Sequence, residues 1–169
     1  MRKEAYMAKT THEFGDFAAQ GVCMAGNAFA SVLLVKGQED FGEEELSALK
    51  ASLEHLGYAP EAWATLLTTT KTGDPINPEL VRQAISAFSP DTVLLVNDAA
   101  VASVREAYAE ELEQLKTDAE KTFSPRVLVR VCGMRMVNLD NFAGALEDPR
   151  QKQLRWAAIK QVPPLGEPY

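Results

Sequence analysis

The stretch VLVRVCGMRMVNLDNFAGALEDPRQKQLRWAAIK, residues 127–160, carries the clearest local signals in this chain. Two β-rich pieces, Val127 to Val131 and Met134 to Leu139, flank Cys132-Gly133, which predicts two strands joined by a tight turn. At Asp148-Pro149 the aspartate can cap a helix and the proline fits the first helical position, with Gln151 placed for a capping box. The predicted order is therefore strand, turn, strand, loop and capped helix.

Upstream of this stretch, apolar strands alternate with amphipathic helices. Strand-like runs occur at residues 30–35, 63–70 and 92–96, and the apolar runs of the first and third are typical of strands buried on both faces. Helical stripes follow at 43–56, at 78–88 and from Asp98 onward. We expect Gly57 to end the first of these helices, Asn77-Pro78 to begin the second and Asp98 to cap the third. This alternation predicts one α/β domain over residues 1–169, with residues 1–13 and 163–169 as extended tails. We expect a three-layer α/β/α sandwich around a central, mostly parallel sheet of four strands.

The composition is that of a globular protein whose surface is not built mainly to grip phosphate. The chain is 46% apolar and 24% charged, and it has a net charge of −7. Because nucleic-acid binding draws much of its strength from Lys and Arg, this charge argues against an extended DNA-binding surface. Cys23 and Cys132 are too far apart to suggest a disulfide framework or a metal site. No apolar run approaches the ~20 residues of a membrane span, and Met1 to Thr11 lacks a signal-peptide core, so we expect a cytoplasmic protein.

Two segments resemble the uracil-DNA glycosylase superfamily, especially its thermostable bacterial and archaeal branch. Residues 89–100, SPDTVLLVNDAA, look like the family's Arg-Pro-x-Val-Ile-Val-Ala-Leu-Gly-x-x-Ala segment. The family's final helix is matched by Asp148-Pro149, Lys152, Trp156 and Lys160. The resemblance extends over residues 31–162 and implies the family's fold, a four-stranded sheet in the order 2-1-3-4.

The loop after the first strand, Gly37-Gln38-Glu39-Asp40-Phe41, is similar to the family's Gly-Gln-Asp-Pro-Tyr or Gly-Glu-Ala-Pro-Gly loop, without the proline. In many members the acidic residue of this loop positions or activates the water that attacks the sugar C1′. The resemblance therefore implies that Glu39 is a catalytic base, because a carboxylate within hydrogen-bond distance of a water can activate it. It implies ligand-binding roles for Gly37, Gln38, Asp40 and Phe41. The alternative is a charged loop that leads into an acidic helix start.

Polar residues also follow the other strands. Thr68 falls where the family has an asparagine that reads the Watson-Crick edge of the flipped uracil. Threonine has one hydroxyl where the amide has both a donor and an acceptor, so this reading would be weaker. The resemblance also places Asn97 and Asn138 at the pocket. Asn141 falls at the catalytic histidine of the His-Pro loop, with Phe142 in place of the proline. The amide of Asn141 could donate to uracil O2, but less strongly than an imidazole.

Other family features are replaced. The loop arginine falls at Glu147, and a carboxylate there would repel phosphates. The first cysteine of the branch's iron-sulfur cluster falls at Thr72, so we expect no cluster, no other cofactor and no metal. The two histidines, His12 and His55, lie outside the three segments matched to the family's active-site motifs, which are the loop at residues 37–41 and the segments around Thr68 and Asn141. We expect His55 at the surface.

Three hypotheses remain open from the sequence. The first is a diverged uracil-DNA glycosylase whose excision of uracil is altered or lost, with a nucleobase or single-stranded DNA as its ligand. The second is a non-catalytic module on the same fold that binds a nucleobase, a nucleotide or a partner protein. The third is an unrelated flavodoxin-like domain with five strands in the order 2-1-3-4-5. No GxGxxG loop follows the first strand, which argues against a nucleotide-binding doubly wound domain. The sequence leaves the oligomeric state open.

Overall fold

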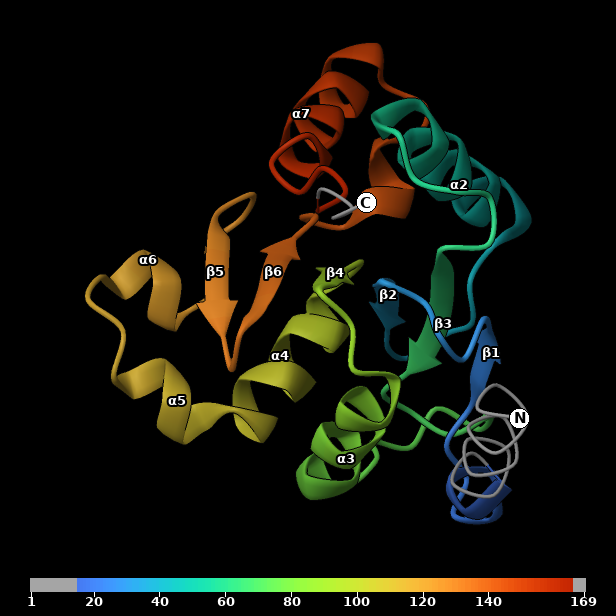
Figure 1. Ribbon diagram of the computed structural model, residues 1–169, viewed down its shortest axis with the longest axis vertical. Coiled ribbons are helices and arrows are strands. Elements are labelled where there is room, and N and C mark those ends of the chain that lie inside the picture. Colours follow the sequence, from blue (N-terminus) through green and yellow to red (C-terminus); the bar gives the residue numbers. More distant parts are fainter. Residues whose placement is uncertain (1–14, 166–169) are drawn as a thin grey trace.

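The computed structural model describes residues 15–165 as a mixed α/β fold in which one six-stranded sheet has helices on both faces (Figure 1). The strands are β1 (Met24–Gly26), β2 (Val32–Lys36), β3 (Trp63–Leu67), β4 (Thr92–Leu95), β5 (Leu128–Val131) and β6 (Met134–Asn138). The helices are α2 (Glu43–Leu56), α3 (Pro78–Phe88), α4 (Asp98–Ala107), α5 (Ala109–Glu113), α6 (Asp118–Lys121) and α7 (Pro149–Ile159), with a 3-10 helix η1 (Phe142–Ala145). Residues 15–19 are also helical. Extended tails were expected at 1–13 and 163–169; residues 1–13 and 166–169 lie outside the described residues, and residues 163–165 are in neither a helix nor a strand.

The sheet has six strands where we expected four. Its order is β1-β3-β2-β4-β6-β5, and β3, β2, β4 and β6 are parallel. Both edge strands are antiparallel, β1 against β3 and β5 against β6. The short β1, of only three residues, has no sequence periodicity that could have predicted it. A tight turn makes the β5–β6 pair antiparallel, so only one of these two strands can run parallel to β4.

The strand order also tests the hypothesis of a flavodoxin-like domain. A flavodoxin-like sheet would have five parallel strands in the order 2-1-3-4-5. Here the strand beyond β6 is β5, which precedes β6 in the chain and runs antiparallel to it. The described sheet therefore differs from the flavodoxin-like order.

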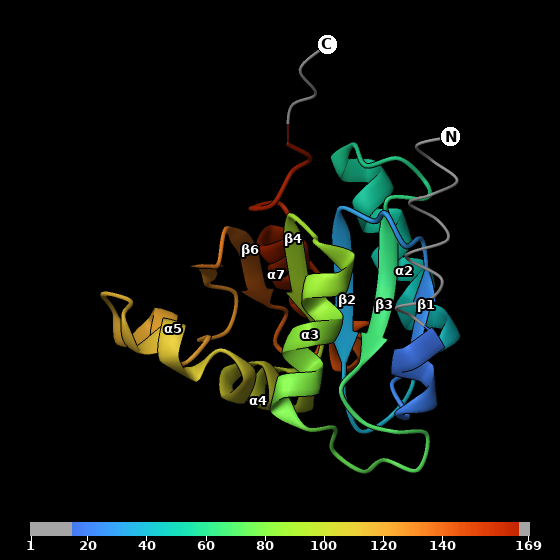
Figure 2. The same cartoon turned by 60° about the horizontal axis from the view of Figure 1, so that its bottom comes forward.

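The residues of the central strands alternate between two apolar cores. Leu33 and Val35 of β2 pack in the core that includes side chains of α3 and α4, whereas Val32 and Leu34 pack in the core that includes α2 and α7. All four side chains are fully buried. In Figure 2 the sheet lies between α3 and α4 on one side and α2 on the other. The unbroken apolar runs of the sequence arise because both faces of these strands are covered.

Most of the predicted helix ends are confirmed. Asn77 and Asp148 each accept a backbone N–H at the start of α3 and α7, and Gly57 ends α2 in the left-handed conformation at φ 113°. The cap of α4 is Asn97 and not Asp98 as predicted, because the Asn97 side chain accepts the N–H of Ala100. The predicted capping box of α7 is also wrong in part: the Gln151 side chain accepts a hydrogen bond from Arg155.

A buried arginine ties the end of the chain to the amino edge of the parallel strands. Arg135 donates to the hydroxyl of Thr92 at 2.7 and 3.2 Å, to the hydroxyl of Tyr58 at 3.2 Å and to the carbonyl of Pro163 at 2.8 Å. The Tyr58 hydroxyl donates to the carbonyl of Val162 at 2.6 Å. Burial raises the pKa of Tyr58, so the phenol stays neutral. This network fastens the segment after α7 to the sheet.

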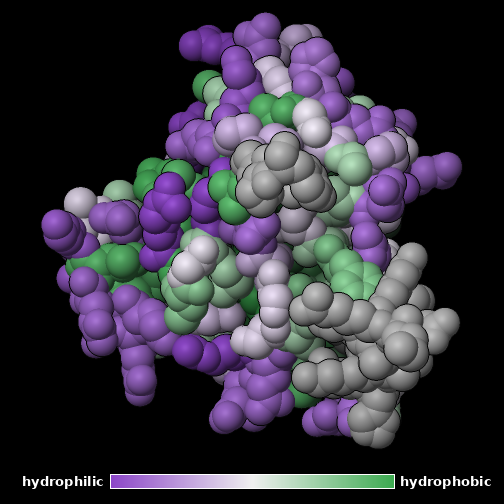
Figure 3. Space-filling model, viewed as in Figure 1, coloured by the Kyte–Doolittle hydropathy of each residue, from purple (hydrophilic) through white to green (hydrophobic). Residues whose placement is uncertain are grey.

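One face of the molecule is seen in Figure 3, where hydrophilic residues predominate and the hydrophobic ones form separate small patches. His55 is exposed and packs edge-on against Trp156, which confirms its expected surface position. Among the described residues no helix combines the length and the apolar character that crossing a membrane requires.

Candidate functional site

The loops that carry the predicted site residues meet at the carboxyl edge of the parallel strands. The strands β2, β3, β4 and β6 are neighbours and parallel, so the segments that follow them emerge at the same edge, where Figure 2 shows β2 and β3 ending. Ligands of open α/β sheets bind at this edge. A ligand site is therefore expected at this edge, beside the loops after β2 and β6.

Asn97, which follows β4, holds two other segments together. Its amide nitrogen donates to the carbonyl of Gly37 at 2.8 Å, and its amide oxygen accepts the N–H groups of Gly37 and Ala100, each at 3.1 Å. The residue is buried. Asn97 thus joins the loop after β2 to the start of α4, and both ends of its amide are used within the protein.

Thr68, which follows β3, lies behind Gly37. It is fully buried, its N–H donates to the carbonyl of Lys36 at 2.9 Å, and its hydroxyl has no partner among the described residues. A Cβ atom on Gly37 would lie 2.5 Å from the Thr68 hydroxyl oxygen and 2.8 Å from the Cβ of Ala99. The space between the ends of β2, β3 and β4 is therefore filled by protein atoms.

Replacing Gly37 with alanine is expected to destabilise the protein by about 1–3 kcal/mol, because the added methyl group overpacks this contact. The free energy of unfolding in urea measures the effect. Gly144→Ala is the matched control, because its Cβ would meet only the end of the exposed Asn141 side chain, with the amide nitrogen at 3.2 Å. Equal stabilities of the two variants would contradict the close packing at Gly37.

Asn138, the last residue of β6, has a structural role. It is buried, its amide nitrogen donates to the carbonyl of Phe123 at 2.8 Å, and its amide oxygen accepts the N–H of Asp140 at 2.8 Å. As at Asn97, both ends of the amide are bonded within the protein. Neither asparagine presents a free donor and acceptor pair to a ligand.

The next residues form a left-handed turn. Asp140 and Asn141 both adopt this conformation, at φ 56° and 57°, which Asp and Asn tolerate better than other residues with a side chain. Arg155 of α7 holds the turn, because it donates to the Asp140 carbonyl and lies 3.5 Å from its carboxylate. The Asn141 side chain is exposed, whereas Phe142 is buried in the core beside α7 and donates its N–H to the carbonyl of Val96 at 2.9 Å.

A buried ion pair lies beside the loop after β2, and the sequence reasoning missed it. Lys36 is 3% exposed, and its ammonium is 2.5 Å from the Glu45 carboxylate, 3.2 Å from the carbonyl oxygen of Asp40 and 3.8 Å from the Glu39 carboxylate. Glu45 also accepts the N–H of Gly42 at the start of α2. The available signals were a lysine at the end of an all-apolar strand and a glutamate at the third position of the next helix.

This ion pair borders an acidic pocket of about 420 Å³. Its walls come from the loop after β2, from the first turn of α2 and from η1. The lining residues are Lys36, Glu39, Asp40, Gly42, Glu43, Glu44, Glu45, Ala143 and Leu146. Five of these residues carry carboxylates and one carries an ammonium group, so the pocket repels phosphate.

The structure thus brings together only part of the predicted site. Glu39 and Asp40 line the acidic pocket, and the side chain of Glu39 is 76% exposed. Gln38 is exposed in a left-handed conformation, and Phe41 is half-buried, with its ring centre 5.8 Å from the Lys36 ammonium. Neither Gln38 nor Phe41 lines this pocket, and the same holds for the other predicted residues, Gly37, Thr68, Asn97, Asn138 and Asn141.

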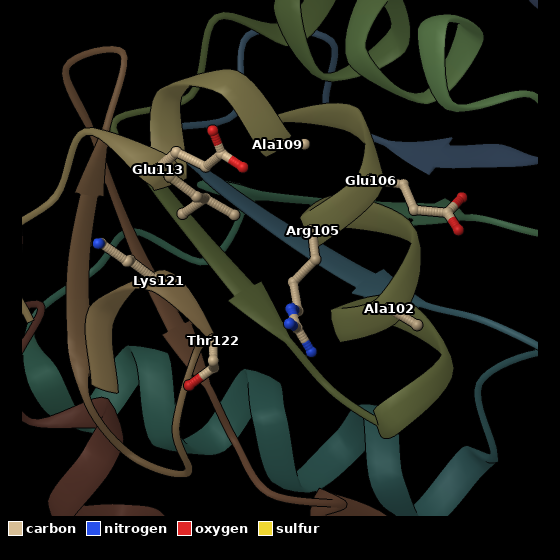
Figure 4. A pocket seen from close by; sticks show the side chains of 8 residues that line it. Ala102, Arg105, Glu106, Ala109, Glu113, Lys121 and Thr122 are labelled. Carbon is tan, nitrogen blue, oxygen red and sulfur yellow. The ribbon is translucent and has the colours of Figure 1, made fainter. Parts of the chain in front are cut away.

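Within residues 15–165, no three His, Cys, Asp or Glu side chains are grouped in a way that could hold a metal ion. A hollow of about 480 Å³ lies between α4 and the α5–α6 segment, and Figure 4 shows it with Arg105, Glu113 and Lys121 around it. None of the predicted site residues lines that hollow.

The fold and this edge define an α/β protein with a central parallel sheet and an acidic pocket beside the ends of its strands. Neither the known family models nor the curated proteins include a match to the chain.

Proposed function

We propose that this protein is a diverged member of the uracil-DNA glycosylase superfamily that keeps the fold and has lost the excision of uracil. The residues that resemble the family, above all 89–100 and the final helix, support the family. The order of the four parallel strands, β3-β2-β4-β6, agrees with the order 2-1-3-4 that the resemblance implies.

The observation that carries the loss of excision is the use of the polar groups at the carboxyl edge within the protein. Reading a flipped uracil requires a donor and an acceptor that are free to face the base. The amides of Asn97 and Asn138 are bonded at both ends, and Thr68 is fully buried behind Gly37. A uracil ring would have to displace these contacts in order to bind.

The other predicted catalytic residues and the carboxylates around them also favour the loss of uracil excision. Asn141 offers a neutral amide where the family has a histidine, and Glu39 is mostly exposed to water, which solvates its carboxylate. The carboxylates of Glu43 and Glu44 next to Glu39 would repel the phosphates of an approaching DNA strand. Hydrolysis at the sugar C1′ requires the sugar to reach this region, and the repulsion of the phosphates opposes that approach.

A binding role without catalysis is the second candidate. The acidic pocket favours it, because five carboxylates around one ammonium group suit a partner with basic side chains better than a nucleotide. On this view the fold acts as a module that binds a protein.

The protein is expected to release no uracil from single-stranded uracil-containing DNA above the level of a sample without protein. Free base is measured over time for the native chain, Glu39→Gln and Asn141→Ala, with an active uracil-DNA glycosylase as the control for the substrate. Release by the native chain that both substitutions abolish would overturn the proposal. If the protein bound this DNA, and the binding weakened as salt was added, the result would count against the expected repulsion between the acidic pocket and the phosphates.

A gain-of-function variant sharpens this test. Thr68→Asn with Asn141→His restores the residue types that the family has at these two positions. The double variant is expected to remain inactive, because the side chain at position 68 would still be buried behind Gly37. Uracil release by this folded variant would show that residue type, and not packing, removed the activity.

A further inference from the structure

A second polar pocket lies at the opposite, amino edge of the parallel strands. It has a volume of about 360 Å³ and lies between the end of α3, the segment before β4 and the turn between β5 and β6. Its lining residues are Arg82, Ser86, Ser89, Pro90, Tyr108, Cys132, Gly133 and Met134. This volume is within the range of small-molecule sites.

Tyr108 contributes a buried hydroxyl to this pocket. The residue is 1% exposed, and its hydroxyl has no hydrogen-bond partner among the described residues. Burial raises the pKa of Tyr108 to about 12, although the charge of Arg82 and the nearby side chain of Ser86 act in the opposite direction. The hydroxyl therefore keeps its proton, and no acceptor in the described part of the chain, Ser86 included, meets it with full hydrogen-bond geometry. A buried donor in this position is costly inside a protein.

Arg82 supplies a positive charge at the same place. One terminal nitrogen of its guanidinium donates to the Glu111 carboxylate at 2.7 Å and to the carbonyl of Ala107 at 3.2 Å. The guanidinium carbon lies 4.7 Å from the centre of the Tyr108 ring. A guanidinium has five N–H donors, and the other two nitrogens of Arg82 have no hydrogen-bond partner in the described part of the chain.

The electrostatic surroundings of the pocket permit an anion. The lining includes one guanidinium and no carboxylate, although the whole chain has a net charge of −7. Two helices end near the pocket, and carbonyl groups at helix ends disfavour anions. Two of these carbonyls are already bonded, that of Ala107 to Arg82 and that of Ser86 to the N–H and hydroxyl of Ser89.

We propose that this pocket binds the oxyanion group, carboxylate or phosphate, of a small molecule through the guanidinium of Arg82 and the hydroxyls of Ser86 and Tyr108. Charge-assisted hydrogen bonds of this kind are stronger than neutral ones. The ligand would supply the acceptor that the Tyr108 hydroxyl lacks. This inference is independent of the proposed function, because it concerns other residues at the other edge of the sheet.

The test uses inorganic phosphate and acetate as probes, each added to the isotope-labelled full chain at constant ionic strength. The amide signals of Ser89, Gly133 and Met134 in NMR spectra report occupancy of the pocket. The exposed thiol of Cys132 gives a second readout, because a bound anion should slow its alkylation by iodoacetamide while Cys23 serves as the internal reference. Saturable shifts with a Kd of about 1 mM are expected for at least one probe.

Variants decide whether the pocket is responsible. Tyr108→Phe keeps the ring and removes only the unpartnered hydroxyl, and it is expected to raise the Kd about tenfold. Ser86→Ala is expected to weaken binding as well, whereas Ser47→Ala on the exposed face of α2 should leave it unchanged. Stronger binding of phosphate or of acetate identifies the group that the ligand carries. The absence of saturation by either probe at about 10 mM, or a Kd that Tyr108→Phe leaves unchanged, would overturn the proposal.

Discussion

Replacing Lys36 with methionine is expected to lower the free energy of unfolding by about 3–5 kcal/mol. The substitution removes the ammonium group and leaves the carboxylate of Glu45, which is 3% exposed, buried without its counter-ion. Breaking a buried pair in this way is costly because the remaining charge is neither solvated nor compensated. Thermal unfolding should show a melting temperature lower by about 10 °C or more.

Two controls isolate the ion pair. Lys152→Met removes a lysine from the exposed side of α7 and is expected to change stability by less than about 0.5 kcal/mol. The double variant Lys36→Met/Glu45→Gln removes both charges and should be more stable than Lys36→Met alone. If Lys36→Met unfolded at the same temperature as Lys152→Met, the ion pair would have no part in the stability of the fold.

Arg135→Met is expected to cost about 2–4 kcal/mol, the second large effect, because hydrogen bonds from a charged donor are among the stronger ones. The variant leaves the buried hydroxyl of Thr92 and the part-buried carbonyl of Pro163 without their donor. The segment after α7 should also loosen, since Arg135 ties it to the sheet. Urea unfolding measures the first effect, and amide hydrogen exchange of residues 158–162 measures the second.

The matched control for Arg135→Met is a substitution of the arginine in the neighbouring strand, β5. Arg130 of β5 is the direct partner of Arg135 in the β5–β6 register, but its side chain is exposed. Arg130→Met is expected to change stability by less than about 0.5 kcal/mol and to leave exchange near the end of the chain unaltered. Similar losses in both variants would mean that strand pairing, and not the network of Arg135, is responsible.

The elements with strong local signals could be predicted from the sequence. The helix at 43–56 has an apolar stripe and a terminal glycine, and it forms over that range as α2. The cap and proline pairs at Asn77-Pro78 and Asp148-Pro149 begin α3 and α7 as expected. The all-apolar runs became buried strands. These predictions depend on interactions between residues a few positions apart, which a sequence displays directly.

The candidate site could be predicted only in part. The loops at the carboxyl edge follow from the order of the strands, and Glu39 and Asp40 do line a pocket there. Asn97, Asn138 and Thr68 were expected to face a ligand, but the contacts that engage or bury them involve residues 15 to 60 positions away along the chain or a neighbouring strand. A resemblance can place a residue at an edge without saying which way its polar group is used.

By itself, the sequence determined the class of the fold, the positions of most helices and the burial of the central strands, because hydrophobic periodicity and helix caps are local. Only the tertiary structure decided three other features. They are the use of Asn97 to join the β2 loop to α4, the pairing of Lys36 with Glu45, and the unpartnered hydroxyl of Tyr108 at the amino edge. Each depends on which distant segments the sheet brings into contact, and hydrogen bonds and buried charges are satisfied, or left unsatisfied, only there.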